Sequence, residues 1–196
     1  MRTKKNRIIL TDIDGVVLDW EEAFLTWMEF NGHDANVQQK KFYSIAKAFG
    51  LSEEKASMLV RQFNTSASIG YLPPLRDAQY YIKLLHEKYS YKFIAITSLS
   101  LDPYAKKLRQ RNLKKLFGSA FIELHCLDTG ADKDKILAKM GALYPGAYWI
   151  EDKIENVDVG IANGLNGLLI EHGFNMNYKG DATVVKSWEE ITEIVT

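Results

Sequence analysis

The sequence contains a single cysteine, Cys126, and only four prolines among its 196 residues. One cysteine excludes a disulfide framework within the chain and fits a reducing compartment. No apolar run approaches the roughly 20 residues that a membrane-crossing helix needs. The first seven residues are basic, as in a secretion signal, but Asp12 and Asp14 interrupt the apolar stretch behind them. We therefore expect a cytoplasmic protein that does not interact with a membrane.

The sequence also has no excess of charge of either sign. It contains 25 lysines and arginines and 25 aspartates and glutamates, so its formal net charge is +0. Proteins that coat DNA or RNA need surplus positive charge against the phosphates, and we therefore expect no polymeric nucleic acid as a partner. Hydrophobic residues make up 46% of the chain, which excludes an intrinsically disordered protein and is enough for a single-domain core.

Short apolar runs alternate with helical patterns along most of the chain. Such runs, bounded by turn residues, are typical of strands buried on both faces of a parallel sheet. They occupy residues 7–10, 92–96, 120–124, 147–150, 167–170 and 183–185. Helices are predicted over 77–89, 103–116, 133–140 and 157–163, and after a capping box at 187–190. The alternation predicts an α/β fold with a doubly wound, Rossmann-like parallel sheet, which binds ligands at the carboxyl ends of its strands.

One segment interrupts the alternation. Residues 20–72 contain no good strand, only helical patterns over 21–31, 38–49 and 52–64. Pro73 and Pro74 end the segment, because the residue before a proline is driven out of the helical conformation. We therefore predict a small helical cap at 20–72, inserted after the first strand of a core domain that is formed by 1–19 and 73–196.

The first chemical signal is an acidic turn that follows the first predicted strand. Asp12 and Asp14 are separated by one residue, so their side chains share a face of an extended backbone, and Gly15 comes next. Two close carboxylates repel each other unless one carries a proton or a cation lies between them. Such a pair suits the hydrolysis of a phosphate ester. One carboxylate can attack as the nucleophile, and the other can act as general acid and base. Mg²⁺ would screen the attacking carboxylate from the charge of the phosphate. The alternative is a solvated turn or a helix cap.

Further polar residues follow the other predicted strands. Thr97 and Ser98 end the second strand, where hydroxyl and backbone N–H groups can hold phosphate oxygens. Lys133 begins a helix and can meet the same anion as a point charge. Glu151 and Asp152 end the fourth strand and offer carboxylates to a divalent cation. Because the carboxyl ends of parallel strands lie at one edge of the sheet, we expect these side chains to converge on one site.

On these residues the sequence resembles the haloacid dehalogenase superfamily of phosphohydrolases, over almost the whole chain. The resemblance rests on segments 10–17, 93–98, 133–137 and 148–157. It implies that Asp12 is a nucleophile that forms an aspartyl-phosphate. Asp14 would be the general acid and base and would give its backbone carbonyl to Mg²⁺. Members that act on carbon usually lack this second aspartate, so Asp14 followed by Gly15 favours phosphoryl transfer.

The resemblance also implies ligands for the phosphate and the metal. Thr97 and Lys133 would hold the phosphoryl group, while Asp152, helped by Glu151, would complete the metal site. Lys135 is an alternative to Lys133, although the spacing from Lys133 to position 137 matches the lysine-to-leucine spacing of the family.

One position departs from the family pattern. Many members have a second acid four residues after the Asp152 position, where this sequence has Asn156. Other members also have asparagine there, and Asp158 lies nearby but off the pattern. Asn156 is the one feature that favours a catalytically silent member, which would bind a ligand without turnover. A receiver-like module that accepts phosphate on Asp12 is a further alternative, although receivers lack a long cap insertion.

The predicted cap is the candidate for substrate selection, because caps commonly choose substrates in this superfamily. It is rich in aromatic residues, most of which we expect to form its own core: Trp20, Phe24, Trp27, Phe30, Phe42, Tyr43, Phe49, Phe63 and Tyr71. Trp20 and Phe24 follow the acidic turn most closely and are the candidates for stacking on a nucleobase.

A narrower resemblance concerns the substrate. Segments 14–19, 71–74 and 97–99 are similar to the 5'(3')-deoxyribonucleotidase branch of the superfamily. This implies a Mg²⁺-dependent phosphatase that acts on nucleoside monophosphates. Sugar phosphates and other small phosphate esters are the alternative substrates, and the sequence does not specify an oligomeric state.

Overall fold

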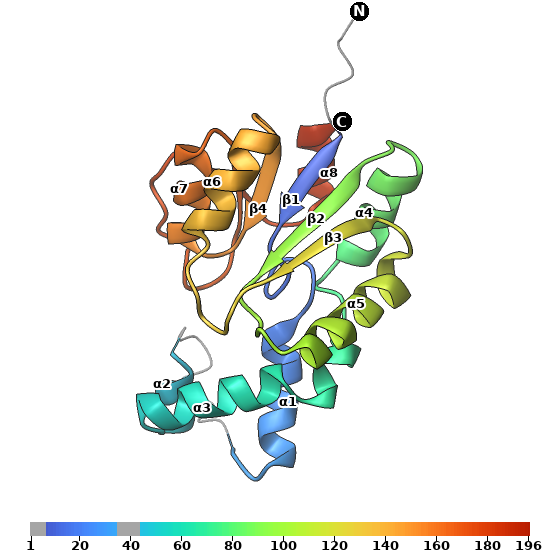
Figure 1. Ribbon diagram of the computed structural model, residues 1–196. Coiled ribbons are helices and arrows are strands. Elements are labelled where there is room, and N and C mark those ends of the chain that lie inside the picture. Colours follow the sequence, from blue (N-terminus) through green and yellow to red (C-terminus); the bar gives the residue numbers. More distant parts are fainter. Residues whose placement is uncertain (1–6, 35–43) are drawn as a thin grey trace, which may run out of the picture.

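A computed structural model describes residues 7–34 and 44–196 of the chain. Six parallel strands form one sheet in the order β3-β2-β1-β4-β5-β6 (Figure 1). They are β1 (Ile8–Thr11), β2 (Lys92–Thr97), β3 (Phe121–Cys126), β4 (Tyr148–Glu151), β5 (Asn166–Ile170) and β6 (Thr183–Val185). Every predicted strand is confirmed, and the parallel sheet of the expected fold class with it.

Helices follow most of the strands and cover both faces of the sheet (Figure 1). They are α4 (Ala78–Glu87), α5 (Pro103–Phe117), α6 (Asp134–Leu143), α7 (Ile154–Ala162) and α8 (Trp188–Val195). Figure 1 shows α6 and α7 on one side of the sheet and α4 and α5 on the other. Asp102 caps α5 by accepting a hydrogen bond from the backbone N–H of Tyr104, and Ser187 caps α8 in the same way. Among the described residues, no helix is both long enough and apolar enough to cross a membrane.

The core consists of two hydrophobic clusters, one on each face of the sheet. In β1, Ile9 belongs to the larger cluster and Leu10 to the smaller one, because successive side chains of a strand point to opposite faces. Both side chains are fully buried. The short continuous apolar runs of the sequence therefore mark strands that are covered on both faces.

Among the described residues, segment 20–72 contains helices and no strand, as predicted. It contains α1 (Trp20–Phe30), α2 (Ile45–Phe49), α3 (Glu53–Asn64) and a short 3-10 helix, η2 (Ala67–Tyr71), which the sequence patterns did not predict. The predicted helix over 38–49 lies partly outside the described residues, which include its end as α2. Figure 1 shows α1 and α3 beyond the carboxyl ends of the strands. The helical segment is thus positioned to cover that edge of the sheet.

The helical segment shares its hydrophobic core with the sheet. Phe24 and Phe63 belong to the same buried cluster as Phe93 of β2. Where the chain leaves and re-enters the core, Leu18 and Pro74 form an antiparallel bridge. The division into a core domain and a cap at these points stays a prediction.

Candidate active site

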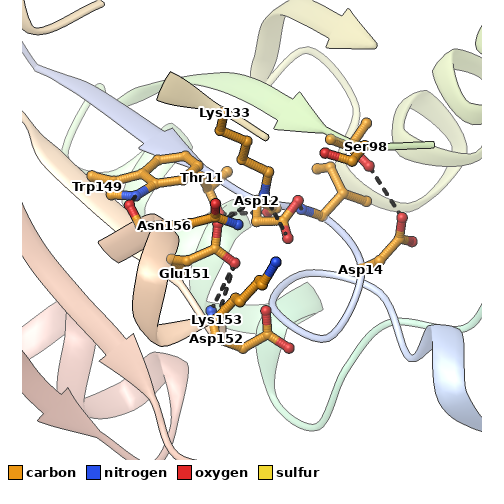
Figure 2. Close-up of polar contacts among 12 residues, drawn as sticks. Thr11, Asp12, Asp14, Ser98, Lys133, Trp149, Glu151, Asp152, Lys153 and Asn156 are labelled. Atoms are coloured by element: carbon orange, nitrogen blue, oxygen red, sulfur yellow. Dashed lines mark hydrogen bonds and ion pairs between the residues drawn. The ribbon is translucent and has the colours of Figure 1, made fainter. Parts of the chain in front are cut away.

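Polar side chains from four segments meet at the carboxyl edge of the sheet (Figure 2). Asp12 follows β1, Thr97 ends β2, Glu151 ends β4 and Lys133 directly precedes α6. Because β1 lies between β2 and β4, the residues that follow these three strands are neighbours in space although they are far apart in the sequence. The structure therefore brings Asp12, Lys133 and Glu151 together.

Lys133 lies at the centre of this group. Its ammonium Nζ is 2.9 Å from Asp12 Oδ2 and 2.8 Å from Glu151 Oε2. Its side chain is only 2% exposed. Lys135, the alternative candidate, is exposed on α6. The structure thus places Lys133, and not Lys135, beside the candidate nucleophile.

Asp12, Glu151 and Asp152 form a group that can hold a metal ion. Each offers one carboxylate oxygen, and the three atoms lie within 4.8 Å of one another. Oxygen donors of this kind are the ligands that Mg²⁺ prefers. Lys133 supplies one positive charge against three carboxylates, so a divalent cation would balance the two charges that remain. The donor atoms and the charge therefore both fit Mg²⁺.

Burial controls the protonation of this group. It raises the pKa of Asp12 to about 8; the charge of Lys133 opposes the shift, and Glu151 and Asp14 add to it. Burial, and to a smaller extent the charge of Asp12, raises the pKa of Asp152 to about 7. Burial also raises the pKa of Glu151. Without a metal ion the group therefore retains protons near neutral pH, and a bound cation would displace them.

Glu151 is held rigidly by the start of α7. Its Oε1 accepts hydrogen bonds from the backbone N–H groups of Asp152 (3.1 Å) and Lys153 (3.2 Å). Its Oε2 accepts the hydrogen bond from Lys133. Both oxygens of Glu151 are thus occupied, which fits the supporting role expected for this residue.

Asn156 and Asp158 differ in their hydrogen-bond partners. Asn156 is in the first turn of α7, where its backbone carbonyl accepts a hydrogen bond from Trp149 Nε1 at 3.0 Å. Asp158 is exposed, and its carboxylate accepts a hydrogen bond from the hydroxyl of Tyr178 at 2.5 Å. Asp158 is therefore engaged elsewhere, while the side chain of Asn156 stays a candidate for supporting the metal site.

Asp14 does not join the three-carboxylate group through its side chain. Its Oδ2 accepts a hydrogen bond from the hydroxyl of Thr97 at 3.1 Å, and its Oδ1 lies 2.6 Å from Nη1 of Arg109. In Figure 2 Asp14 lies apart from the residues around Lys133. The sequence analysis did not identify Arg109, although a charged residue on the buried face of α5 is a signal that could have found it.

The two hydroxyls predicted to hold phosphate have protein partners in this structure. Thr97 donates to Asp14, and Ser98 donates to the backbone carbonyl of Ala131 at 2.7 Å. The second contact ties the end of β2 to the loop that leads to Lys133. Phosphate binding by Thr97 and Ser98 stays a prediction.

The acidic turn packs closely against Asp152, and hydrogen bonds from His172 and Asn175 hold both in place. Gly15 has a φ of +80°, and a Cβ at this position would lie 2.4 Å from Asp152 Oδ2. Nε2 of His172 donates to the Gly15 carbonyl at 2.7 Å. Asn175 donates to the Asp152 carbonyl at 2.8 Å and accepts from the backbone N–H of His172 at 2.8 Å. The spacing of the histidines along the chain does not predict the hydrogen bond between His172 and Gly15.

One of the two aromatic residues proposed for substrate stacking, Phe24, is buried, whereas the other, Trp20, is partly exposed. Phe24 is 1% exposed, and its ring stacks on Trp20 with centroids 4.7 Å apart. Phe24 is therefore a core residue in this structure and not an open stacking surface. Trp20 is partly exposed, and its Nε1 donates to Asn64 Oδ1 at 2.9 Å.

The remaining aromatic residues of the predicted cap range from buried to exposed, and Trp27 and Phe49 are partly buried against the core. Phe63 is fully buried, whereas Phe30 is 87% and Tyr71 is 69% exposed. Phe42 and Tyr43 lie outside the described residues. The expectation of an aromatic core therefore holds for Phe63 and Phe24, but not for Phe30 and Tyr71.

No protein-family model matches the chain. Its sequence is similar to that of an uncharacterized 32.4 kDa protein of Enterobacteria phage T4, with 33% identity over 155 residues. The match covers 76% of this chain and 55% of the phage protein. The chain thus spans about half the length of the curated relative that it matches.

Solved structures share the fold. A haloacid dehalogenase-like hydrolase from Streptococcus pneumoniae has a TM-score of 0.66 and 17% identity, with 96% of this chain and 98% of that chain covered. CbbY from Rhodobacter sphaeroides, in complex with phosphate, has a TM-score of 0.60 and 15% identity, with 94% and 96% covered. The D,D-heptose 1,7-bisphosphate phosphatase from B. bronchiseptica, complexed with magnesium and phosphate, has a TM-score of 0.60 and 12% identity, with 96% and 97% covered. At these identities the likeness is one of fold.

Proposed function

We propose, from the haloacid dehalogenase hydrolase fold of this chain and from its acidic site, that the protein is a Mg²⁺-dependent phosphatase of small phosphomonoesters. The observation that carries the proposal is the position of Lys133. Its buried ammonium lies between Asp12 and Glu151, at the edge of a three-carboxylate group. A nucleophilic carboxylate, a fixed positive charge and a cation site side by side are what the cleavage of a phosphate ester requires.

Asp12 and Asp152 would supply carboxylate oxygens to the metal ion, with Glu151 in a supporting role beside them, and the resemblance adds the backbone carbonyl of Asp14. When bound, Mg²⁺ screens the charge of the phosphate from the attacking carboxylate. The substrate must bring its own negative charge into a group that is already acidic. Lys133 offsets part of that charge from a position that the core fixes.

The proposed reaction has two steps. A carboxylate oxygen of Asp12 attacks the phosphorus and forms an aspartyl-phosphate, while the ester oxygen leaves and takes a proton from Asp14. A water molecule then attacks the phosphorus of the aspartyl-phosphate and gives a proton to Asp14. Inorganic phosphate leaves, and the carboxylate of Asp12 is restored.

The substrate class that we propose is the nucleoside monophosphates. Support comes from the likeness of segments 14–19, 71–74 and 97–99 to the deoxyribonucleotidase branch, and from the partly exposed Trp20 near the acidic turn. Sugar phosphates are the second candidates, and one structural neighbour is by its name a phosphatase of a heptose bisphosphate. In either case the partner is a small molecule.

Phosphate release from a panel of nucleoside monophosphates and sugar phosphates tests the proposal. We expect turnover with MgCl₂, none with excess EDTA, and none from the Asp12→Asn variant. Mass spectrometry of peptides from protein quenched in acid during turnover is expected to show phosphate on Asp12. No turnover of any ester by the wild type, or undiminished turnover by Asp12→Asn, would contradict the proposal.

A further inference from the structure

Arg109 is a fully buried cation with a single counter-ion among the described residues. It lies on the inner face of α5, between the buried residues Leu108 and Asn112, and its side chain is 0% exposed. Arginine is almost never fully buried unless it is paired. Its one ion pair joins Nη1 to Oδ1 of Asp14 at 2.6 Å. Its Nε and Nη2 atoms have no acceptor among the residues that the structure describes.

Both oxygens of Asp14 are held by side chains from the core. Arg109 on α5 holds Oδ1, and the hydroxyl at the end of β2, on Thr97, donates to Oδ2. The Asp14 side chain is itself 22% exposed. Because a carboxylate can accept about four hydrogen bonds, these two contacts fix its orientation and leave lone pairs open on the solvent side.

We propose that Arg109 is a positioning residue for proton transfer by Asp14. The inference rests on the proposed phosphatase activity. A proton donor acts efficiently only when it is held within hydrogen-bond reach of the leaving oxygen. The acidic turn that carries Asp14 is a loop, whereas Arg109 is enclosed by the packing of α5. Arg109 therefore fixes the Asp14 carboxylate to the rigid core.

A comparison of two leaving groups separates positioning from a merely structural role. Phenyl phosphate and 4-nitrophenyl phosphate have similar shapes, but nitrophenolate leaves readily without a proton and phenolate does not. The kcat/KM values report the steps up to departure of the leaving group. Poor positioning of Asp14 is therefore expected to lower kcat/KM mainly for phenyl phosphate.

For Arg109→Met we expect a loss of about 100-fold in kcat/KM for phenyl phosphate. For 4-nitrophenyl phosphate we expect a loss about tenfold smaller. Arg109→Lys is expected to recover part of the loss, because lysine retains the positive charge but lacks the planar guanidinium group. Asn112→Ala is the matched control: Asn112 is buried on the same helix and donates to the Leu72 carbonyl at 3.0 Å. It is expected to leave the ratio of the two substrates unchanged. Equal losses on both substrates in Arg109→Met would overturn the positioning role.

A double-mutant cycle, measured by Tm, tests the pairing of Arg109 with Asp14 without any need for turnover. In Asp14→Asn, Arg109 stays buried without a counter-charge, so we expect Tm to fall by about 5–15 °C. Arg109→Met leaves the partly exposed Asp14 to be hydrated, and its loss is expected to be smaller. The double variant Asp14→Asn/Arg109→Met is expected to melt above Asp14→Asn alone. Additive losses in the double variant would overturn the single-counter-ion assignment.

The two experiments also separate this inference from the proposed function. If the wild type hydrolyses neither aryl phosphate nor any ester of the panel, the phosphatase proposal fails and the positioning role fails with it. The double-mutant cycle then still decides whether Asp14 is the counter-ion of Arg109. If the wild type turns over but the leaving-group ratio does not change in Arg109→Met, only the positioning role fails.

Discussion

The Nζ atom of Lys133 lies 2.9 Å from Oδ2 of Asp12 in an ion pair whose side chains are only 2% and 11% exposed. Burial lowers the pKa of Lys133, but the charges of Asp12 and Glu151 raise it more, so the lysine stays charged. The carboxylates have the opposite tendency, because burial raises the pKa of Asp12 to about 8. The charge state of the site therefore depends on the carboxylates and on what they bind.

Replacing this lysine is expected to affect stability and activity together. Lys133→Met removes the buried partner of Asp12 and Glu151, so we expect it to lower the free energy of unfolding by about 3 kcal/mol at pH 8. The loss is expected to be smaller at pH 5, where the carboxylates bind protons. Urea unfolding at both pH values measures the effect. The exposed Lys135→Met is the control and is expected to stay within about 0.5 kcal/mol of the wild type. A Lys133→Met variant as stable as the wild type at pH 8 would argue against the buried pair.

The metal-free protein is expected to lose stability as the pH rises. The pKa values of Asp12 and Asp152 are raised from an ordinary 3.8 to about 8 and about 7. A carboxyl group with a raised pKa in the folded state contributes fully below its unfolded pKa, and that contribution is lost as pH rises through the folded pKa. In EDTA, we therefore expect Tm to fall between pH 5 and pH 8.

Matched variants identify the residues behind this pH dependence. Asp152→Asn is expected to flatten the decrease and to raise Tm at pH 8 in EDTA, because it removes one buried charge. Asp181→Asn changes an exposed aspartate and is expected to follow the wild type. A Tm that rises from pH 5 to pH 8 in EDTA would contradict the assignment of the buried carboxylates.

Binding of Mg²⁺ is expected to release protons from the site. Cation and proton compete for the same oxygens of Asp12 and Asp152, so the affinity for Mg²⁺ should increase from pH 6 to pH 8. Calorimetric titrations in two buffers of different ionisation enthalpy measure the number of protons released. We expect a release that is larger at pH 6 than at pH 8 and much weaker binding in Asp152→Asn. Affinity that does not change with pH would show that these carboxyls are not the ligands.

Gly15 offers a test of the close packing between the acidic turn and Asp152. Gly15→Ala adds a Cβ that would lie 2.4 Å from Asp152 Oδ2, at a φ of +80°. Gly164 has a φ of +82°, and a Cβ added there would meet nothing within 4 Å, so Gly164→Ala carries the backbone strain alone, about 1–2 kcal/mol. Both variants should lose stability in urea, but only Gly15→Ala should bind Mg²⁺ more weakly. Equal affinity in the two variants would show that the contact with Asp152 is unimportant for the cation.

The parts of the fold that the sequence predicts well have simple local signals. The strand that ends in Thr97 contains four consecutive apolar residues, and the cap of α5 at Asp102 is a side-chain contact over two residues. Such features depend on neighbouring residues only. The convergence of Asp12 and Glu151 also follows, because parallel strands end at one edge of a sheet.

The parts that the sequence does not predict depend on contacts between distant residues. Nothing in the residue types around Phe24 says whether its ring faces the site or the core, and packing against Phe63 decides it. The pairing of Arg109 with Asp14 and of His172 with Gly15 joins residues from separate elements. Sequence patterns show which side of a helix is buried, but not which partner is found there.

The sheet order has a consequence for how the site forms during synthesis. β1 is made first, yet it ends up between β2 and β4, and β4 is complete only at Glu151. At about 5–20 residues per second, the ribosome needs on the order of 10 s to make the chain between these strands. During that time the apolar β1 and the carboxylate of Asp12 have no native neighbour on the β4 side. The site is therefore assembled late, from residues of which Asp12 is among the first to be made.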